Sequence, residues 1–327
     1  MSPNFKLKTK ITLLFQELFI PLQSNLQFER KMCILQLPAK IPSSIDGYNA
    51  LSKLFFDMQE LVKQSNRITI DFSKCKVFDG NLCAAMGAIF DYFSKKAAIV
   101  LLIPPERRIR QVLSRNHFLR AWQVKTDVQD KENYVKYSRF KSNNAEEFKQ
   151  YIDEWLIGKQ KFPGHTKAVG DSLIESIYEI YVNASMHGET DYVYSCGEYK
   201  ESSTTFEMAV VDLGKTVPYN VNHFFEKKGF QSMSACDAIS WAFAEGHTTK
   251  EDTGGLGLSL LKEFIELNKG SLHMVSAGGF VEYTNEKFQF HTLDLDFPGT
   301  IVNIKFNFND SKHYRMTSET PDINDLL

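Results

Sequence analysis

The chain has 327 residues, of which 43% are hydrophobic and 24% are charged, and its formal net charge is -2 at pH 7. This balance is typical of a folded protein with a buried core, and the length fits two domains. It excludes a disordered or collagen-like chain, and the near-neutral charge argues against a protein that coats nucleic acid.

Cysteines and apolar segments indicate the compartment. The five cysteines never form a C-x-x-C pair, so we expect reduced thiols. They are Cys33, Cys75, Cys83, Cys196 and Cys236. Residues 11–22 are apolar, but Gln16 and Glu17 interrupt them and no small-residue cleavage site follows, which predicts an amphipathic docking helix. No run reaches the roughly 18–20 apolar residues of a membrane span. We therefore expect a cytoplasmic protein that binds neither membrane nor nucleic acid.

The N-terminal part of the chain alternates between strand and helix patterns. Apolar residues recur at helical spacing in some segments and form short continuous runs in others. Strands are expected at residues 32–37, 67–72 and 98–103, and helices at 49–63, 82–93 and 109–119. Such alternation predicts an α/β domain.

A polar stretch separates this part from a second block. Residues 124–143 contain few large apolar side chains, which predicts a domain boundary, and a helix is expected at 145–156. The second block starts with a long helix and continues with strands and further helices. We divide the chain into an N-terminal helical segment (1–30), an α/β domain (31–123), a linker and helix (124–166), a second domain (167–310) and a polar tail (311–327).

The first informative motif is the helix expected over residues 171–188, DSLIESIYEIYVNASMHG. Glu175, Glu179, Asn183 and His187 are four residues apart, so they share one face. A solvated polar stripe is one interpretation. A magnesium–nucleotide site is the other, because an amide oxygen is a hard ligand and a carboxylate can orient water.

A second motif follows in residues 205–214, TFEMAVVDLG, which predict a buried strand with Asp212 at its end. A carboxylate there can accept a hydrogen bond from an adenine amino group, while Gly214 lets the backbone turn closely beneath the base. An ordinary turn is the simpler interpretation of this pattern alone. The following Gly-Lys-Thr resembles the end of a P-loop, but position 209 is Ala where that motif needs Gly, which excludes a P-loop.

The third motif is G-G-L-G, residues 254–257, at the entry to a helix expected over 256–267. Glycines there leave backbone N–H groups uncovered, and the helix dipole favours an anion, so this segment suits phosphates. A tight turn packed against a strand is the alternative. A Gly-Thr pair at 299–300 then opens a strand expected over 301–306.

In this order the motifs resemble the ATP-binding domain shared by DNA gyrase, heat-shock chaperones, mismatch-repair ATPases and histidine kinases, the GHKL superfamily. The matching motifs are E-x-x-x-N-A-x-x-H at 179–187, D-x-G at 212–214, G-G-x-G-L at 254–258 and Gly-Thr at 299–300. The resemblance covers about residues 167–308. It implies a Bergerat-type α/β sandwich within an α+β chain, with ATP and Mg²⁺ as cofactors.

The resemblance also implies a role for each matching residue. Glu179 would act as the general base, and Asn183 would hold Mg²⁺ against the phosphates. Asp212 would bind the adenine amino group, with Gly214 beneath the base and Thr300 supporting the adenine end. The residues expected near the phosphates are His187, Gly254, Gly255, Leu256, Gly257 and, from a lid expected over 217–252, Lys250. A simply solvent-exposed lysine is an equal alternative for the last of these.

One position departs from the family pattern. The family usually has D-x-G-x-G, whereas this chain has Thr216 at the second glycine. A residue with a β-carbon cannot take every glycine conformation, so we expect the loop under the ribose and the lid to differ.

Residues 32–123 resemble a STAS domain, the fold of anti-sigma factor antagonists, around the turn V-F-D-G-N. A simple α/β packing module is the alternative. In the STAS family a GHKL-fold kinase phosphorylates a Ser or Thr just after the Asp. Here Gly80 and Asn81 follow Asp79, so the phosphoacceptor is missing. The two resemblances together imply partner switching within one chain, with the first domain as regulator or docking surface.

These patterns exclude some functions and leave three. A histidine kinase needs a phosphoacceptor on a dimerising helical hairpin, and neither His117 nor His165 has that context; a gyrase-like machine needs a further domain. The remaining functions are a slow Mg²⁺-dependent ATPase that switches a protein partner, an anti-sigma-type Ser/Thr kinase acting on a separate protein, and a non-catalytic nucleotide-binding module. Glu179 and Asn183 together argue against the third, and the missing phosphoacceptor favours the first. A protein partner, and a homodimer as one arrangement, are expected.

Overall fold

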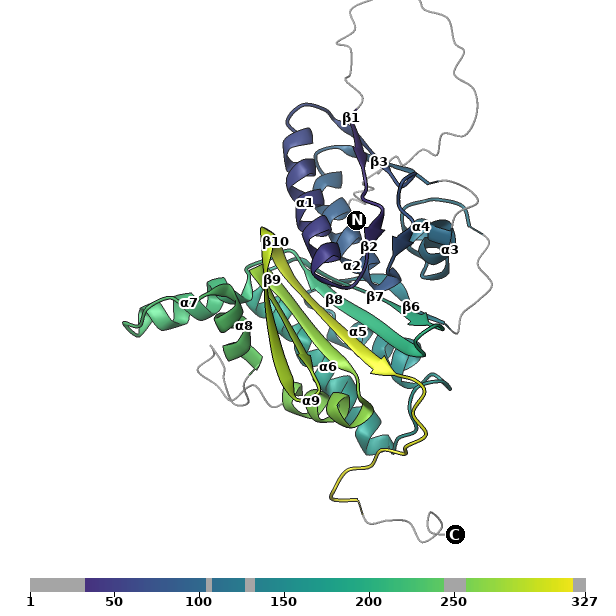
Figure 1. Cartoon of the computed structure of the whole chain (residues 1–327), viewed down its shortest axis with the longest axis vertical. Coiled ribbons are helices and arrows are strands. Elements are labelled where there is room, and N and C mark those ends of the chain that lie inside the picture. Colours follow the sequence, from purple (N-terminus) through teal and green to yellow (C-terminus); the bar gives the residue numbers. More distant parts are fainter. Residues whose placement is uncertain (1–32, 104–107, 127–132, 244–256, 320–327) are drawn as a thin grey trace, which may run out of the picture.

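The computed structural model describes residues 33–103, 108–126, 133–243 and 257–319. The predicted N-terminal helical segment (1–30) lies outside these residues. The fold is a mixed α/β arrangement, as the sequence predicts. Figure 1 shows an N-terminal unit (33–103 and 108–126) above a second unit (133–243 and 257–319) that is built on a larger sheet.

The N-terminal unit is built on a parallel sheet of three strands. Their order is β1 (Cys33–Gln36), β3 (Arg67–Asp71) and β5 (Ala98–Leu102). The short strands β2 (Lys40–Ile41) and β4 (Val77–Phe78) pair beside it. The helices are α1 (Ile45–Leu61), the turn η1 (Gly80–Leu82), α2 (Cys83–Ser94), α3 (Arg108–Arg115) and α4 (Phe118–Ala121). Each predicted strand in this unit is confirmed.

The prediction of one helix over residues 109–119 is wrong in one respect, because the structure divides this segment into α3 and α4. His117 between them takes a left-handed backbone conformation with φ 62°. Asn116 stabilises this break: its side-chain oxygen accepts from Phe118 N at 3.0 Å, and its Nδ2 donates to Gly80 O at 3.1 Å. An Asn side chain that bonds nearby backbone competes with helix hydrogen bonds.

The second unit is built on a five-stranded antiparallel sheet in the order β6-β7-β8-β10-β9. The strands are β6 (Tyr134–Lys141), β7 (Tyr192–Lys200), β8 (Thr205–Asp212), β9 (Ser271–Thr284) and β10 (Lys287–Asn307). The last two form a hairpin, and β10 extends far beyond the strand expected at 301–306.

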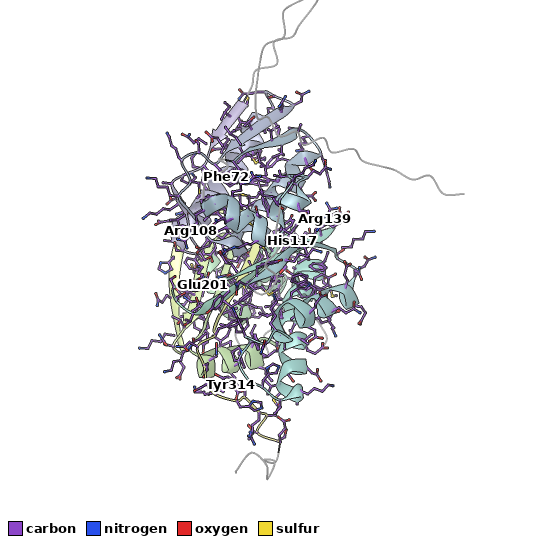
Figure 2. The ribbon with its side chains drawn as sticks, turned by 90° about the vertical axis from the view of Figure 1, so that its right-hand side faces the viewer. Phe72, Arg108, His117, Arg139, Glu201 and Tyr314 are labelled. Atoms are coloured by element: carbon purple, nitrogen blue, oxygen red, sulfur yellow. The ribbon has the colours of Figure 1, made fainter. Side chains whose placement is uncertain are left out.

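Strand β6 corrects the predicted boundary at 124–143. Its buried residues, among them Val135, Tyr137 and Phe140, alternate with charged ones, and the strand pairs with β7. Arg139 Nη1 lies 2.7 Å from Asp91 Oδ1 on α2, and Figure 2 shows Arg139 beside the N-terminal unit. Part of the expected linker is therefore the edge of the sheet.

Helices cover both faces of the five-stranded sheet. On one face lie α5 (Ala145–Ile152), its π-helical extension η2 (Asp153–Ile157), α6 (Lys167–His187) and α9 (Gly257–Asn268). Helices α1 and α2 contact the other face. Because α2 lies between two layers, it is apolar around most of its surface. The outer helices α7 (Val217–Lys227) and α8 (Ala235–Phe243) project from the β9 edge (Figure 1).

The two units share one hydrophobic core. Leu54 and Phe90 of the N-terminal unit belong to the same buried cluster as Ala209, Val211 and Ile301 of the sheet. A separate cluster fills the space between the sheet and α6. The N-terminal unit is therefore packed on the sheet as a layer.

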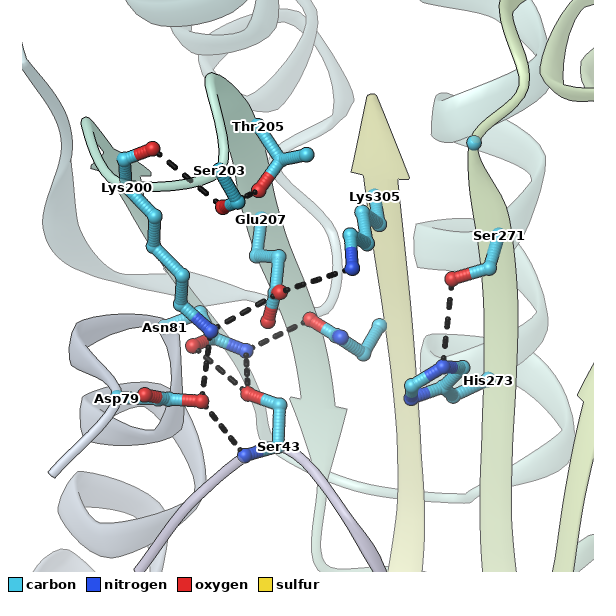
Figure 3. Close-up of polar contacts among 12 residues, drawn as sticks. Ser43, Asp79, Asn81, Lys200, Ser203, Thr205, Glu207, Ser271, His273 and Lys305 are labelled. Atoms are coloured by element: carbon cyan, nitrogen blue, oxygen red, sulfur yellow. Dashed lines mark hydrogen bonds and ion pairs between the residues drawn. The ribbon is translucent and has the colours of Figure 1, made fainter. Parts of the chain in front are cut away.

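A polar network crosses this shared interface (Figure 3). Lys200 Nζ at the end of β7 lies 2.7 Å from Asp79 Oδ2 and 2.9 Å from Glu207 Oε1. Gly80 N donates to Glu198 Oε2 at 2.6 Å, although burial raises the pKa of that carboxyl group. The network joins the start of η1 to strands β7 and β8.

Both ends of the second unit also differ from expectation. Helix α6 begins at Lys167, before the predicted 171, because the Thr166 hydroxyl accepts from Val169 N and caps it. Tyr314, in the predicted polar tail, is buried and forms a β-bridge with His165. Figure 2 shows Tyr314 at the end of the second unit far from the N-terminal unit. The described part of the tail is thus held against the second unit.

Candidate functional site

Strand β8 ends at a buried acidic residue, as predicted. Asp212 is 2% exposed, and its Oδ1 accepts a hydrogen bond from Gly214 N at 2.9 Å. Among the described residues no lysine, arginine or histidine forms an ion pair with it. Burial raises the pKa of Asp212 to about 8, although the Gly214 N–H favours the charged form.

Three backbone segments approach one another closely around Asp212. A Cβ on Gly214 would lie 2.0 Å from Gly188 O, the carbonyl that ends α6, and a Cβ on Gly299 would lie 2.1 Å from Asp212 O. Lys215 N donates to Gly188 O at 2.7 Å. Glycine is required where backbones meet at this distance. The sequence predicts Gly188 only as a helix end, so its part in the site is new.

Helix α6 brings three of the predicted residues along one face. Glu179, Asn183 and His187 occupy successive turns, are half-buried, and approach the Gly188 end in that order. Glu175, one turn earlier, belongs to the surface instead, because it is exposed and pairs with Lys149 Nζ at 2.6 Å. The solvated-stripe interpretation therefore holds for Glu175, while the roles of Glu179, Asn183 and His187 stay predictions.

Thr300 is the register partner of Asp212 on β10 and is buried. Its hydroxyl lies 2.9 Å from Ser276 Oγ on β9. Ser276 also donates to Gly299 O at 2.9 Å and accepts from Val217 N at 2.9 Å. Sequence reasoning missed Ser276, because an isolated serine in a strand carries no local signal.

Thr216 takes a conformation open to any residue. Its φ of -77° and ψ of 158° are extended, and its hydroxyl accepts from Tyr219 N at 3.3 Å as the N-cap of α7. Asn220, on the first turn of α7, donates through Nδ2 to His187 O at 2.9 Å. Where the family pattern has glycine, this chain therefore starts a helix that is attached to α6.

The remaining predicted residues lie outside the described part or at its edge. Lys250, Gly254, Gly255 and Leu256 fall outside it, and Gly257 is the first residue of α9. Helix α9 packs along α6. Of the predicted set, the structure brings together the end of α6, Asp212, Gly214 and Thr300.

Within residues 33–103, 108–126, 133–243 and 257–319, no group of three or more His, Cys, Asp or Glu side chains could hold a metal ion. In the same residues no helix is long and apolar enough to cross a membrane. No model of a known protein family matches the chain, and no curated protein matches it.

Proposed function

We propose that the second unit binds ATP with Mg²⁺ and hydrolyses it slowly, and that the nucleotide state controls binding of a protein partner. The observation that carries this proposal is the buried Asp212 carboxyl group, which has no cationic partner among the described residues and lies between the end of α6 and Thr300. A carboxyl group kept in such surroundings costs stability, which a bound donor can offset.

Adenine fits this position chemically. Gly214 N already occupies Oδ1 of Asp212, and no described residue donates to Oδ2, so an exocyclic amino group can donate there. The missing side chains at Gly188, Gly214 and Gly299 let the backbone segments around the carboxyl group approach one another closely. Thr300 would support the adenine end through its hydroxyl, which also lies 2.9 Å from Ser276 Oγ.

The preceding turns of α6, on the same face as His187, suit the phosphates. Asn183 and Glu179 lie one and two turns before His187 on α6. The amide oxygen of Asn183 would be a Mg²⁺ ligand, and the Glu179 carboxylate would orient the attacking water. Because Mg²⁺ keeps phosphate and water ligands, one protein oxygen suffices for this role. The segment 254–257 would contribute backbone N–H groups.

We further propose that the N-terminal unit is a STAS-like regulator. Its parallel strands and helices α1 and α2 support this. All five cysteines are free thiols, which supports a cytoplasmic protein.

Position 81, where the STAS family carries its phosphoacceptor, is fully buried, and Asn81 Nδ2 donates to Asn303 Oδ1 at 2.7 Å. If the second candidate function, a Ser/Thr kinase, applied, its substrate would therefore be a separate protein. A homodimer belongs to the same proposal.

The test follows the γ-phosphate of labelled ATP with Mg²⁺ in the wild type, in Glu179→Ala and in Glu175→Ala. The wild type should bind ATP and release phosphate, and Glu179→Ala should bind ATP but lose at least about 100-fold in rate. Glu175→Ala is the matched control, since that residue is on the same helix but pairs with Lys149, and it should retain wild-type release. Binding without release in the wild type would favour the kinase, and no ATP binding would refute the proposal.

A further inference from the structure

Helix α7 is fastened to the candidate site at its first turn. The first four N–H groups of a helix have no partner inside it. Of these, Val217 N donates to Ser276 Oγ and Tyr219 N to the Thr216 hydroxyl. Asn220 adds a side-chain bond to His187 O. The start of α7 therefore touches both the β9–β10 end and the α6 end of the site.

Ser276 is the central member of this attachment. Its side chain is fully buried, and its three contacts, to Val217 N, Gly299 O and Thr300 Oγ1, all lie at 2.9 Å. A serine hydroxyl can donate once and accept twice, so these contacts use its whole capacity if Thr300 donates to it. Any ligand that draws the Thr300 hydroxyl toward itself would thus change the bonding at Val217 N.

We infer that Ser276 is a positioning residue that couples the adenine end of the site to helix α7, so that α7 and α8 form the output element of the switch. The inference rests on the proposed function for its ligand, while the attachment itself does not depend on any ligand. The inference also explains why Thr216 occupies the position where the family pattern has glycine. Thr216 caps α7, and a capped helix transmits a displacement that a flexible glycine loop would absorb.

The outer surface of α7 and α8 carries aromatic side chains that are suited to contact a protein partner. Phe224, Phe225 and Trp241 pack together between the two helices, with ring centroids 5.4–5.8 Å apart. Tyr219 is 52% exposed and Phe230 is 60% exposed on the same arm. A change at the first turn of α7 would therefore move exposed aromatic side chains relative to the sheet.

The experiment measures amide hydrogen exchange of residues 217–227 without nucleotide. Ser276→Ala should accelerate exchange in α7 by about tenfold, since a buried hydrogen bond is lost, and Ser276→Thr should restore slow exchange by returning the hydroxyl. The matched control is Ser195→Ala on β7, which also removes a buried hydroxyl bond, to Ala209 O at 2.9 Å, but has no connection to α7. It should leave exchange in α7 unchanged.

The second arm repeats the measurement with ATP and Mg²⁺. ATP should change exchange of α7 and α8 in the wild type and in Ser195→Ala, and in Ser276→Ala it should bind with the change in α7 reduced. Unchanged nucleotide-free exchange in Ser276→Ala, or equal ATP effects in Ser276→Ala and the wild type, would overturn the inference. If ATP does not bind the wild type, the proposed function fails, and the nucleotide-free comparison alone decides whether Ser276 anchors α7.

Discussion

Strand β8 carries two buried acidic residues, Glu207 and Asp212, whose surroundings differ. Glu207 faces the N-terminal unit and lies 2.9 Å from Lys200 Nζ and 3.9 Å from Lys305 Nζ (Figure 3). Asp212 faces α6, and within the described part of the chain its carboxyl group accepts one hydrogen bond, from the backbone N–H of Gly214. The first carboxylate is balanced by positive charge within the protein, as a structural residue requires. The second has no cation beside it among the described residues, which supports the binding site proposed above.

The pKa values follow the same division. Burial lowers the pKa of Lys200, but the carboxylates of Glu207 and Asp79 outweigh this and hold it above its ordinary value. At Asp212 burial dominates and raises the pKa. Lys200 therefore keeps its charge at neutral pH, whereas the Asp212 carboxyl group binds a proton more tightly than an ordinary aspartate does.

The largest expected effect comes from removing the cation that balances Glu207. Lys200→Met leaves the Asp79 and Glu207 carboxylates without their shared cation, and should lower the free energy of unfolding by about 3–5 kcal/mol. Urea denaturation measures it. The control Lys53→Met removes an exposed pair with Asp57 and should cost only about 0.3–0.5 kcal/mol. Equal effects in the two variants would mean that the interface network is not structural.

The second prediction concerns the unbalanced carboxyl group. The pKa of Asp212 rises from 3.8 to about 8 on folding, so between these pH values the folded protein binds the extra proton. Stability should therefore fall as pH rises through this window, by up to about 1.4 kcal/mol per pH unit. Asp212→Asn should remove this part of the slope and also abolish ATP binding. Denaturation curves from pH 5 to 8 test it, and an unchanged slope in Asp212→Asn would contradict the assignment.

The smallest effect concerns the backbone around Asp212. In Gly214→Ala the new methyl group would meet Gly188 O, which should cost about 1–3 kcal/mol and weaken ATP binding. Gly229→Ala is the control, because nothing lies within 4 Å of its Cβ and only its φ of 80° is unfavourable. The control should lose about 1 kcal/mol and bind ATP normally. Thermal melts and nucleotide titrations separate the two variants.

Local patterns predict much of the fold, because most strands are short apolar runs. Strands β5 and β8 are buried on both faces and can be recognised from their own residues. Strand β6 cannot be recognised as easily, since charged residues such as Lys136 and Arg139 alternate with its buried ones. The shared core could not be predicted at all, because an apolar pattern does not say which surface it meets.

The same distinction applies to the candidate site. Asp212 and Gly214 form a local turn pattern, so their proximity is predictable from the sequence. Gly188 and Ser276 matter through contacts with residues far along the chain, which only the fold brings close. The roles of Glu179 and Asn183 stay predictions, since position on a helix face does not identify a ligand.

The shared core has a consequence for synthesis of the protein on the ribosome. Helices α1 and α2 are synthesised early, but the sheet that covers their apolar sides includes β10, which ends at Asn307. At translation rates of about 5–20 residues per second, the apolar sides of α1 and α2 stay uncovered for roughly 10–40 s, until β10 has been synthesised. The nascent N-terminal unit therefore exposes apolar helix surface to aggregation for that time, and its final packing depends on translation of the last strand.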